Sequence, residues 1–310
     1  MELKNQPTPE VSNLKNQRIL FAALNWGMGH VSRSLSILQQ LEEQNNALII
    51  ACNPQQESIF RGYIQSARYV SLPDYPFIFN QVGFRISDFI RSLPALIRSY
   101  QKEQQWVRNL VQHETINYIL SDHRYGFRNP KIPSVFMTHQ CRLPLPWFGF
   151  MAQWVHRYFL RQFSTCWIMD DAGKRWAGKL SSAPNIPCYY LGNTSRFQRT
   201  SGPKKWNVLV LNGPSQFNAL LIRHFQPEIG KLDYVIGTHS LIPPHIPQIQ
   251  DWKEADRVLR EAETLFSFCG YSTLLDVAAL GCSWRTIPTP GQLEQEYLFQ
   301  QKTLREGGFL

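Results

Sequence analysis

The sequence predicts an α/β protein with two domains, each built on a mostly parallel sheet. Short, continuous apolar runs alternate with stretches of helical periodicity, which is typical of βαβ units whose sheet is covered on both faces. This alternation occurs twice, before and after a segment rich in Gly, Ser, Pro and Lys at residues 192–205. The length of 310 residues also leaves room for two domains of ordinary size.

The first domain is expected at residues 18–191, after a loose polar leader at residues 1–17. Six apolar runs predict its strands, because each is too continuous for a half-exposed strand: 18–24, 46–52, 67–72, 116–121, 133–138 and 164–169. Helical periodicity is clearest at 30–44, where four apolar residues fall on one face, namely Val31, Leu35, Leu38 and Leu41.

The second domain is expected at residues 206–310, after the linker at 192–205. Its candidate strands are 206–211, 233–238, 263–268 and 283–288, and its candidate helices lie near 215–226, 253–261, 272–280 and 292–305. Ligands of parallel sheets bind beyond the carboxyl ends of the strands, so the loops that follow strands are the candidate sites. We expect the two domains to face each other across a cleft.

The chain is basic, with 32 Lys and Arg residues against 23 Asp and Glu and a net charge of +9. This charge favours anionic partners such as nucleotides, nucleic acid or acidic lipid headgroups. The positive residues are spread along the chain without a run of five, which disfavours a dedicated nucleic-acid surface.

The six cysteines are scattered and form no CxxC pair, which disfavours a disulfide framework and a zinc cluster. No apolar stretch approaches the ~20 residues of a membrane span, and the polar start lacks a signal-peptide core. We therefore expect a protein of the reducing cytoplasm.

The stretch LNWGMGHVSRSL at residues 24–35 follows the first predicted strand and opens the first helix. Gly27 and Gly29 allow a sharp turn and let a ligand approach the N–H groups at the helix start. His30 at the first helical turn can stay neutral and take a proton from a hydroxyl. The same residues also fit a plain strand-helix joint, with glycines that serve packing and a histidine that caps the helix.

Other nucleotide-binding fingerprints are disfavoured. The third glycine of a dinucleotide motif is missing, no acidic residue ends the second strand, and the chain has no GKS or GKT of a P-loop. His139 follows a predicted strand and is expected to line the cleft. The other histidines have no metal-like spacing, so we expect no metal site.

The stretch FSFCGYSTLLD contains a second group of candidate binding residues. Gly270 follows a strand, Ser272 and Thr273 cap the next helix, and Asp276 lies about one turn into it. Amides at such a helix start can hold a diphosphate, and the carboxylate can accept hydroxyl protons; a nucleotide sugar offers both groups. The apolar face of the same helix also fits a structural role in the core.

Polar residues also follow the next strand, in the stretch PTPGQLEQE. A rigid Pro/Gly turn there precedes a helix start whose side chains suit hydrogen bonds to sugar hydroxyls: Gln292, Glu294 and Gln295.

Taken together, these motifs resemble those of the GT-B glycosyltransferases, in particular the branch of the UDP-N-acetylglucosamine transferase of peptidoglycan synthesis and its bacterial relatives. The segments that carry the resemblance are NWGMGHVSRSL, SDHRYGF, PSVFMTHQ, YYLGNTSRF, GYSTLLDVAALG and IPTPGQLEQEYL, in the family's order. The resemblance implies two Rossmann-like domains and no metal or cofactor. It also implies that the C-terminal domain holds a nucleotide-sugar donor and that the N-terminal domain holds the acceptor.

The resemblance further implies roles for single residues of the donor site. Gly270, Ser272 and Thr273 would bind the diphosphate. Asp276 would bind the ribose, and Glu294 with Gln295 would bind the sugar.

On the acceptor side, the resemblance places Gly27, Gly29 and His30 along the acceptor and against the diphosphate. His30 is the candidate general base, because the acceptor hydroxyl must lose a proton as it attacks the anomeric carbon. Asp122, at the end of a predicted strand, is placed to orient His30, as an acidic residue does in related plant and animal enzymes. A strand-end cap is the alternative role of Asp122. A single displacement would invert the anomeric centre.

The sequence departs from the family at two places. Phe268 and Cys269 stand where relatives commonly have Arg-Ser, so a positive phosphate partner is missing, and relatives continue beyond Leu310. These departures favour a second hypothesis, a catalytically weakened nucleotide-sugar-binding protein of the same fold. A nucleotide-sugar epimerase of this fold is a third.

The leading hypothesis is a bacterial, cytoplasmic glycosyltransferase that moves a sugar from a UDP-sugar to a glycan or lipid-linked acceptor of the cell envelope. Residues 142–163 bear on its location, because they concentrate aromatic residues together with arginines: Trp147, Phe148, Phe150, Trp154, Tyr158 and Phe159 with Arg142, Arg157 and Arg161. The segment fits a helix packed into the first domain with its arginines outside. It also fits a surface that rests on the inner face of an acidic membrane and presents a lipid-linked acceptor.

Overall fold

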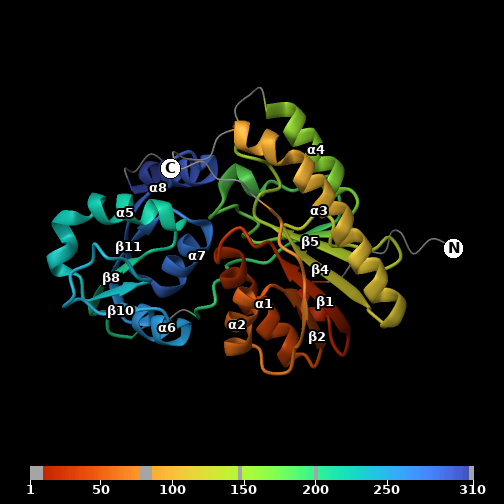
Figure 1. The fold of residues 1–310 in the computed structure, drawn as a ribbon, viewed down its shortest axis with the longest axis horizontal. Helices are drawn as coiled ribbons and strands as arrows, with labels where there is room; N and C mark the ends of the chain where they lie inside the picture. Colours follow the sequence, from red (N-terminus) through yellow and green to blue (C-terminus); the bar gives the residue numbers. More distant parts are fainter. Residues whose placement is uncertain (1–9, 77–85, 146–148, 199–201, 307–310) are drawn as a thin grey trace. The chain divides into compact units, whose positions relative to one another are not determined.

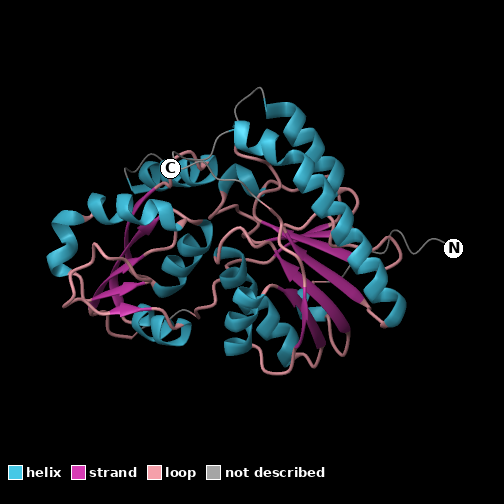
Figure 2. Ribbon diagram, viewed as in Figure 1, coloured by secondary structure: helices cyan, strands magenta, loops and turns pink. Residues whose placement is uncertain are grey.

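The computed structural model describes residues 10–76, 86–145, 149–198 and 202–306. These residues form two compact units, which meet in the sequence between Thr194 and Ser195 (Figure 1). Each unit contains one parallel sheet with helices on its faces, as Figure 2 shows. The predicted class, α/β with two parallel-sheet domains, is therefore confirmed.

Unit 1 is built on a seven-stranded sheet in the order β3-β2-β1-β4-β5-β6-β7, with all neighbours parallel. Its strands are β1 (Arg18–Ala23), β2 (Ala47–Cys52), β3 (Arg68–Ser71), β4 (Tyr118–Asp122), β5 (Ser134–Thr138), β6 (Thr165–Ile168) and β7 (Cys188–Tyr190). Its helices are α1 (Gly29–Glu43), α2 (Pro54–Tyr63), α3 (Ile86–His113) and α4 (Phe150–Leu160).

The apolar runs explain why six of these strands were predictable. In β1, all residues from Ile19 to Ala23 are buried, because helices cover both faces of the sheet. Strand β7 was not predicted. It has only three residues, all half-buried at the sheet edge, and so lacks a long apolar run.

Unit 2 contains a five-stranded parallel sheet in the order β10-β9-β8-β11-β12. Its strands are β8 (Trp206–Val210), β9 (Tyr234–Ile236), β10 (Gln248–Ile249), β11 (Ala262–Phe268) and β12 (Ser283–Ile287). Its helices are α5 (Ser215–His224), α6 (Trp252–Arg260), α7 (Tyr271–Leu280) and α8 (Leu293–Glu306). The four predicted strands are present, and the two-residue edge strand β10 is additional.

The strand order gives each unit a topological switch point. In unit 1 the chain leaves β1 toward β2 on one side and leaves β4 toward β5 on the other, and in unit 2 the neighbours β8 and β11 do the same. Ligands of open α/β sheets bind outside the carboxyl ends of the strands at such points. The loops after β1 and β4, and after β8 and β11, are therefore where a site is expected.

None of the helices within the described residues combines the length and the apolar character that crossing a bilayer requires.

Candidate functional site

The predicted residues of the first domain lie together at the switch point of unit 1. The loop of Gly27 and Gly29 follows β1, Asp122 is the last residue of β4, and His139 comes directly after β5. Because β1, β4 and β5 are neighbours, their carboxyl ends bring these segments to one edge of the sheet.

The glycine loop is held by the segment that follows β3. The Asn25 side chain accepts a hydrogen bond from the Tyr75 N–H at 3.0 Å, and Trp26 Nε1 donates to the Tyr75 carbonyl at 3.2 Å. Gly27 has a φ of +113°, a conformation that a side chain would strain, and its position is exposed. Gly29 then begins α1, so the loop turns from strand to helix as predicted.

His30 and Asp122 form a hydrogen-bonded pair. Nδ1 of His30 lies 3.0 Å from Oδ1 of Asp122, whose side chain is fully buried, while 15% of the His30 side chain is exposed. Among the residues that the structure describes, none hydrogen-bonds Nε2 of His30. A proton on Nδ1 donated to Asp122 therefore leaves a lone pair on Nε2 that can accept a hydroxyl proton.

Arg33 and Ser34 complete the surroundings of Asp122, and neither was predicted. Arg33 Nε donates to Oδ2 at 3.0 Å, its Nη2 donates to Oδ1, and the Ser34 hydroxyl donates to Oδ2 at 3.1 Å. Burial by itself would raise the pKa of the Asp122 carboxyl, but Arg33 and His30 outweigh it and hold this pKa well below the usual range. Asp122 is thus a permanent carboxylate. Arg33 could have been found from its i+3 spacing to His30 on the helix.

The imidazole of His30 is kept neutral by its surroundings. Burial lowers its pKa, and the Arg33 guanidinium, whose Nη2 lies 2.6 Å from Nδ1, lowers it further, while Asp122 acts in the opposite direction. A position in the first turn of α1 also disfavours a cation, because the helix N-terminus is positive. A histidine that is unprotonated at neutral pH can act as a general base.

Two further histidines surround this pair. Arg33 Nη1 lies 3.0 Å from Nδ1 of His139, so His139 is part of the same cluster of side chains. His123, which directly follows Asp122, stacks edge-on to His30 with ring centroids 5.2 Å apart. Burial lowers the pKa of His123, as do the nearby Arg33 and His30. His123 was missed, although its place after the strand in SDH was visible.

The predicted donor residues lie at the carboxyl edge of the unit 2 sheet. Gly270 follows β11 and is the N-cap residue of α7, so Ser272 and Thr273 fall in the first turn of that helix. Asn212, after β8, donates from Nδ2 to the Thr273 hydroxyl at 2.8 Å and to the Phe268 carbonyl at 3.0 Å. Asn212 was not predicted, and it joins the ends of β8 and β11 at the switch point.

Asp276 is bound within unit 2. It accepts hydrogen bonds from the Ser195 hydroxyl and from Arg196 Nη1, each at 2.6 Å, and Arg196 Nε also contacts Asp256 at 2.8 Å. Burial raises the pKa of the Asp276 carboxyl, and Arg196 partly offsets this. Its predicted contact with a ribose is untested, and any such contact would compete with these two donors.

The residues after β12 form a local network at the start of α8. Gln295 accepts a hydrogen bond from the Thr289 N–H at 2.9 Å and donates to Gln292. Glu294 is half-buried in the same turn. The structure thus brings Gln292, Glu294 and Gln295 together, one strand away from Gly270.

Phe268, which stands where relatives commonly have an arginine, lies in the core of unit 2. Its side chain is fully buried in the core of unit 2, where it packs with Leu209 and Phe217 among others. Cys269 is also fully buried, and burial raises the pKa of its thiol to about 12. An arginine at position 268 in this backbone would point into the apolar core and not toward a diphosphate.

No group of His, Cys, Asp and Glu side chains within the described ranges is arranged to hold a metal ion.

Several solved structures share this fold. The glycosyltransferase of kitacinnamycin aligns with a TM-score of 0.62 and 14% sequence identity, and the alignment covers 93% of this chain and 85% of the glycosyltransferase. UGT2 of Phytolacca americana, complexed with UDP-2fluoro-glucose and pterostilbene, has a TM-score of 0.61 at 12% identity, with 94% and 85% covered. The spinosyn rhamnosyltransferase SpnG, complexed with thymidine diphosphate, has a TM-score of 0.61 at 17% identity, with 92% and 85% covered.

These similarities show that the chain has the GT-B fold. No protein-family model matches the sequence, and no curated protein does either.

Proposed function

We propose that this protein is a glycosyltransferase that moves a sugar from a nucleotide-diphospho-sugar to a hydroxyl acceptor. The observation that carries the proposal is the His30–Asp122 pair at the switch point of unit 1, with a 3.0 Å contact and a neutral imidazole. The GT-B fold supports it, since the solved structures with this fold include glycosyltransferases complexed with UDP-2fluoro-glucose or thymidine diphosphate.

In the proposed reaction, His30 acts as the general base. Asp122 accepts a hydrogen bond from the Nδ1–H and fixes the ring, and Nε2 takes the proton of the acceptor hydroxyl as its oxygen attacks the anomeric carbon. The bond from that carbon to the diphosphate breaks, and its electron pair leaves with the nucleoside diphosphate. One displacement from the opposite face inverts the anomeric centre.

Unit 2 is proposed to bind the donor. The diphosphate meets the N–H groups at the start of α7, where Gly270, Ser272 and Thr273 lie, because a helix N-terminus stabilises negative charge. The sugar hydroxyls bind Glu294 and Gln295, and Gln292 supports them. The donor nucleotide is proposed to be a uridine diphosphate.

The acceptor is proposed to be a glycan or lipid-linked hydroxyl, bound by unit 1 through the loop of Gly27 and Gly29 and through His139. The enzyme is proposed to act in the cytoplasm, at or near the inner face of the membrane. The net charge of +9 supports an anionic acceptor or surface.

The test compares His30→Ala with His113→Ala, a control in which an exposed histidine at the end of α3 is removed from the same unit. We expect His30→Ala to slow the release of nucleoside diphosphate about 100-fold or more, since a general base contributes that much. Donor affinity, measured by calorimetry, should change little, because the proposed donor residues lie in unit 2. The control should match the wild type.

Other outcomes identify the alternatives. Full activity of His30→Ala would show that His30 is only a helix-start residue. Binding of UDP-sugars without transfer to any acceptor extract would indicate a catalytically weakened binding protein, and a changed sugar without an acceptor would indicate an epimerase. A wild type that binds none of the UDP-, GDP-, dTDP- or CDP-sugars would refute the proposal.

A further inference from the structure

Helix α4 in unit 1 exposes an apolar face to solvent. Its exposed residues recur at helical spacing on one side, with exposures from 43 to 69%: Phe150, Met151, Trp154, Val155 and Tyr158. The opposite side packs on the unit through His156 and Leu160. A helix on the surface of a soluble domain ordinarily has its polar residues outside, so this arrangement is inverted.

The predicted packing of this segment is therefore only partly correct. Phe159 packs into the unit, with its ring 5.1 Å from that of Tyr125. The three arginines of the segment, Arg142, Arg157 and Arg161, are exposed as expected. Trp154 and Tyr158, however, are outside as well. Trp147 and Phe148 lie outside the described residues.

The neighbouring helix α3 extends the apolar surface. Figure 1 shows α3 and α4 side by side, and the rings of Tyr100 and Phe159 lie 5.3 Å apart. Leu93 and Ile97, one turn apart on α3, are 42% and 49% exposed. An apolar surface that spans two helices is larger than the scattered exposed residues of most monomers and marks an interaction site.

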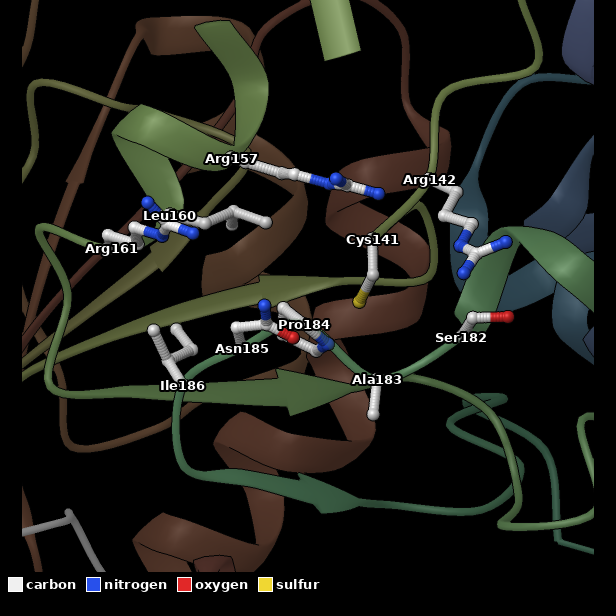
Figure 3. A pocket seen from close by; sticks show the side chains of 10 residues that line it. All are labelled: Cys141, Arg142, Arg157, Leu160, Arg161, Ser182, Ala183, Pro184, Asn185 and Ile186. Atoms are coloured by element: carbon white, nitrogen blue, oxygen red, sulfur yellow. The ribbon is translucent and has the colours of Figure 1, made fainter. Parts of the chain in front are cut away.

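A basic pocket lies beside this surface. It is a cavity of about 100 Å³ with ten lining residues, of which three are arginines and none is acidic: Cys141, Arg142, Arg157, Leu160, Arg161, Ser182, Ala183, Pro184, Asn185 and Ile186. Figure 3 shows Arg157 reaching from α4 across the pocket toward the segment of Arg142, with residues 182–186 below them. Within the described parts of the chain, no carboxylate lies within 4.0 Å of these three guanidinium groups.

Helix α4 is fixed in place by a buried histidine. His156 Nε2 donates to the Gln140 carbonyl at 2.9 Å, so its Nδ1 accepts from the Tyr125 hydroxyl at 2.6 Å. Burial lowers the pKa of His156 to about 4, so the ring stays neutral and holds this arrangement at neutral pH. The basic side chains are thus carried on a rigid element, which lowers the entropy that binding would cost.

We propose that this face of unit 1 docks on an anionic phospholipid bilayer, with a headgroup phosphate in the basic pocket and the exposed residues of α4 and α3 at the lipid interface. This proposal goes beyond the transferase function and stands without it. A cavity of about 100 Å³ is well below the ~300 Å³ of pockets for drug-sized ligands, so it suits a phosphate group and not a whole nucleotide.

Charge and side-chain type favour a bilayer as the occupant. Arginines next to an apolar helix face match the two layers that an anionic membrane presents, the phosphates and the upper acyl chains. Trp154 and Tyr158 stack with ring centroids 6.2 Å apart, and these two residue types concentrate at membrane interfaces.

The test uses the full chain with vesicles of phosphatidylcholine alone or mixed with phosphatidylglycerol, in a flotation assay at low and high salt. We expect binding to the anionic vesicles alone, weakened by salt. Arg157→Gln combined with Arg161→Gln should weaken binding about thirtyfold, since each basic residue near an anionic surface contributes roughly a factor of five. Arg108→Gln, which changes an exposed arginine elsewhere on α3, should bind like the wild type.

A second variant tests the apolar face. Trp154→Ser should also release the protein from anionic vesicles, while circular dichroism remains unchanged because the side chain is 68% exposed. Brominated lipids should quench the fluorescence of the wild type more than that of Trp154→Phe. Neither vesicle flotation nor fluorescence quenching requires a sugar donor or catalytic turnover. A failed transferase assay would therefore leave the membrane proposal untouched.

Four results would overturn the proposal. Equal binding of the wild type to neutral and anionic vesicles would exclude the phosphate pocket. Equal binding of the wild type and the double arginine variant to anionic vesicles would exclude it as well. Stabilisation by inorganic phosphate without vesicle binding would assign the pocket to a soluble anion. Concentration-dependent dimerisation that Trp154→Ser abolishes, without vesicle binding, would assign the face to a second copy of the chain.

Discussion

Replacing Arg33 with methionine should raise the pKa of His30. In the native structure, Arg33 Nη2 lies 2.6 Å from His30 Nδ1, so a protonated imidazole would place its positive charge against this guanidinium. Methionine removes the cation but keeps an unbranched side chain in the space. Asp122 stays 3.0 Å from His30 and still accepts from Ser34 at 3.1 Å, so it then favours the imidazolium.

The size of the change follows from Coulomb's law. Two unit charges 2.6 Å apart interact by about 1.6 kcal/mol at the dielectric constant of water and by about 6 kcal/mol at an effective value of 20. Both charges are delocalised, which favours the lower part of this range, and like charges at such distances shift a pKa by about 1 to 3 units. We expect the pKa of His30 to rise from its lowered native value, because Arg33 no longer adds to the lowering that burial causes.

The groups that face His30 set the sign. Arg33 on α1, and His123 and His139 if protonated, oppose an imidazolium, whereas Asp122 on β4 favours it. Only the permanent cation is removed in Arg33→Met, so protonation becomes easier. If His30 is the base, the acid side of the pH profile of kcat/KM moves to higher pH.

The assay is a titration of the imidazole nitrogens by nuclear magnetic resonance, with His30→Ala used to assign the signal. Arg33→Lys keeps a positive charge and should leave the pKa low, and Arg108→Met serves as an unrelated control. A pKa of His30 that stays the same or falls in Arg33→Met would refute the reasoning. The measurement requires no substrate, so it tests the electrostatics separately from the proposed function.

Two predictions concern unit 2. Phe268→Arg should lower the free energy of unfolding of this unit by about 3 to 5 kcal/mol, because it buries an unpaired cation. The control Phe268→Leu should lower it by about 1 kcal/mol. A stable Phe268→Arg variant with tighter donor binding would support the phosphate-partner hypothesis instead. Arg196→Met leaves the carboxylates of Asp256 and Asp276 without their shared cation and should cost a similar amount near pH 7. Loss of the Arg196 cation should raise the pKa of Asp276 further. A carboxyl whose pKa is raised in the folded state destabilises the protein more as pH rises, because it must ionise there. The loss of stability measured by urea unfolding should therefore be smaller near pH 4.5 than near pH 7. An equal penalty at both pH values would contradict this.

The sequence by itself determined where the strands lie and which loops follow them. Buried parallel strands require continuous apolar runs, and ten of the twelve strands in the described part of the chain were visible for this reason. The two that were missed, β7 and β10, are short edge strands. Asp122 was found because it directly follows an apolar run, and His30 because it lies in the first helical turn after the glycine loop.

The tertiary structure decided which of these residues meet, and how. Strands β1 and β4 are neighbours in the sheet, although 94 residues separate the end of β1 from the start of β4. This strand order brings Arg33 into contact with Asp122. The direction of a side chain was equally out of reach: Phe268 points into the core and Trp154 points out of it, although both stand among apolar residues. Apolar periodicity reports that a residue can be buried, whereas the neighbouring elements determine whether it is.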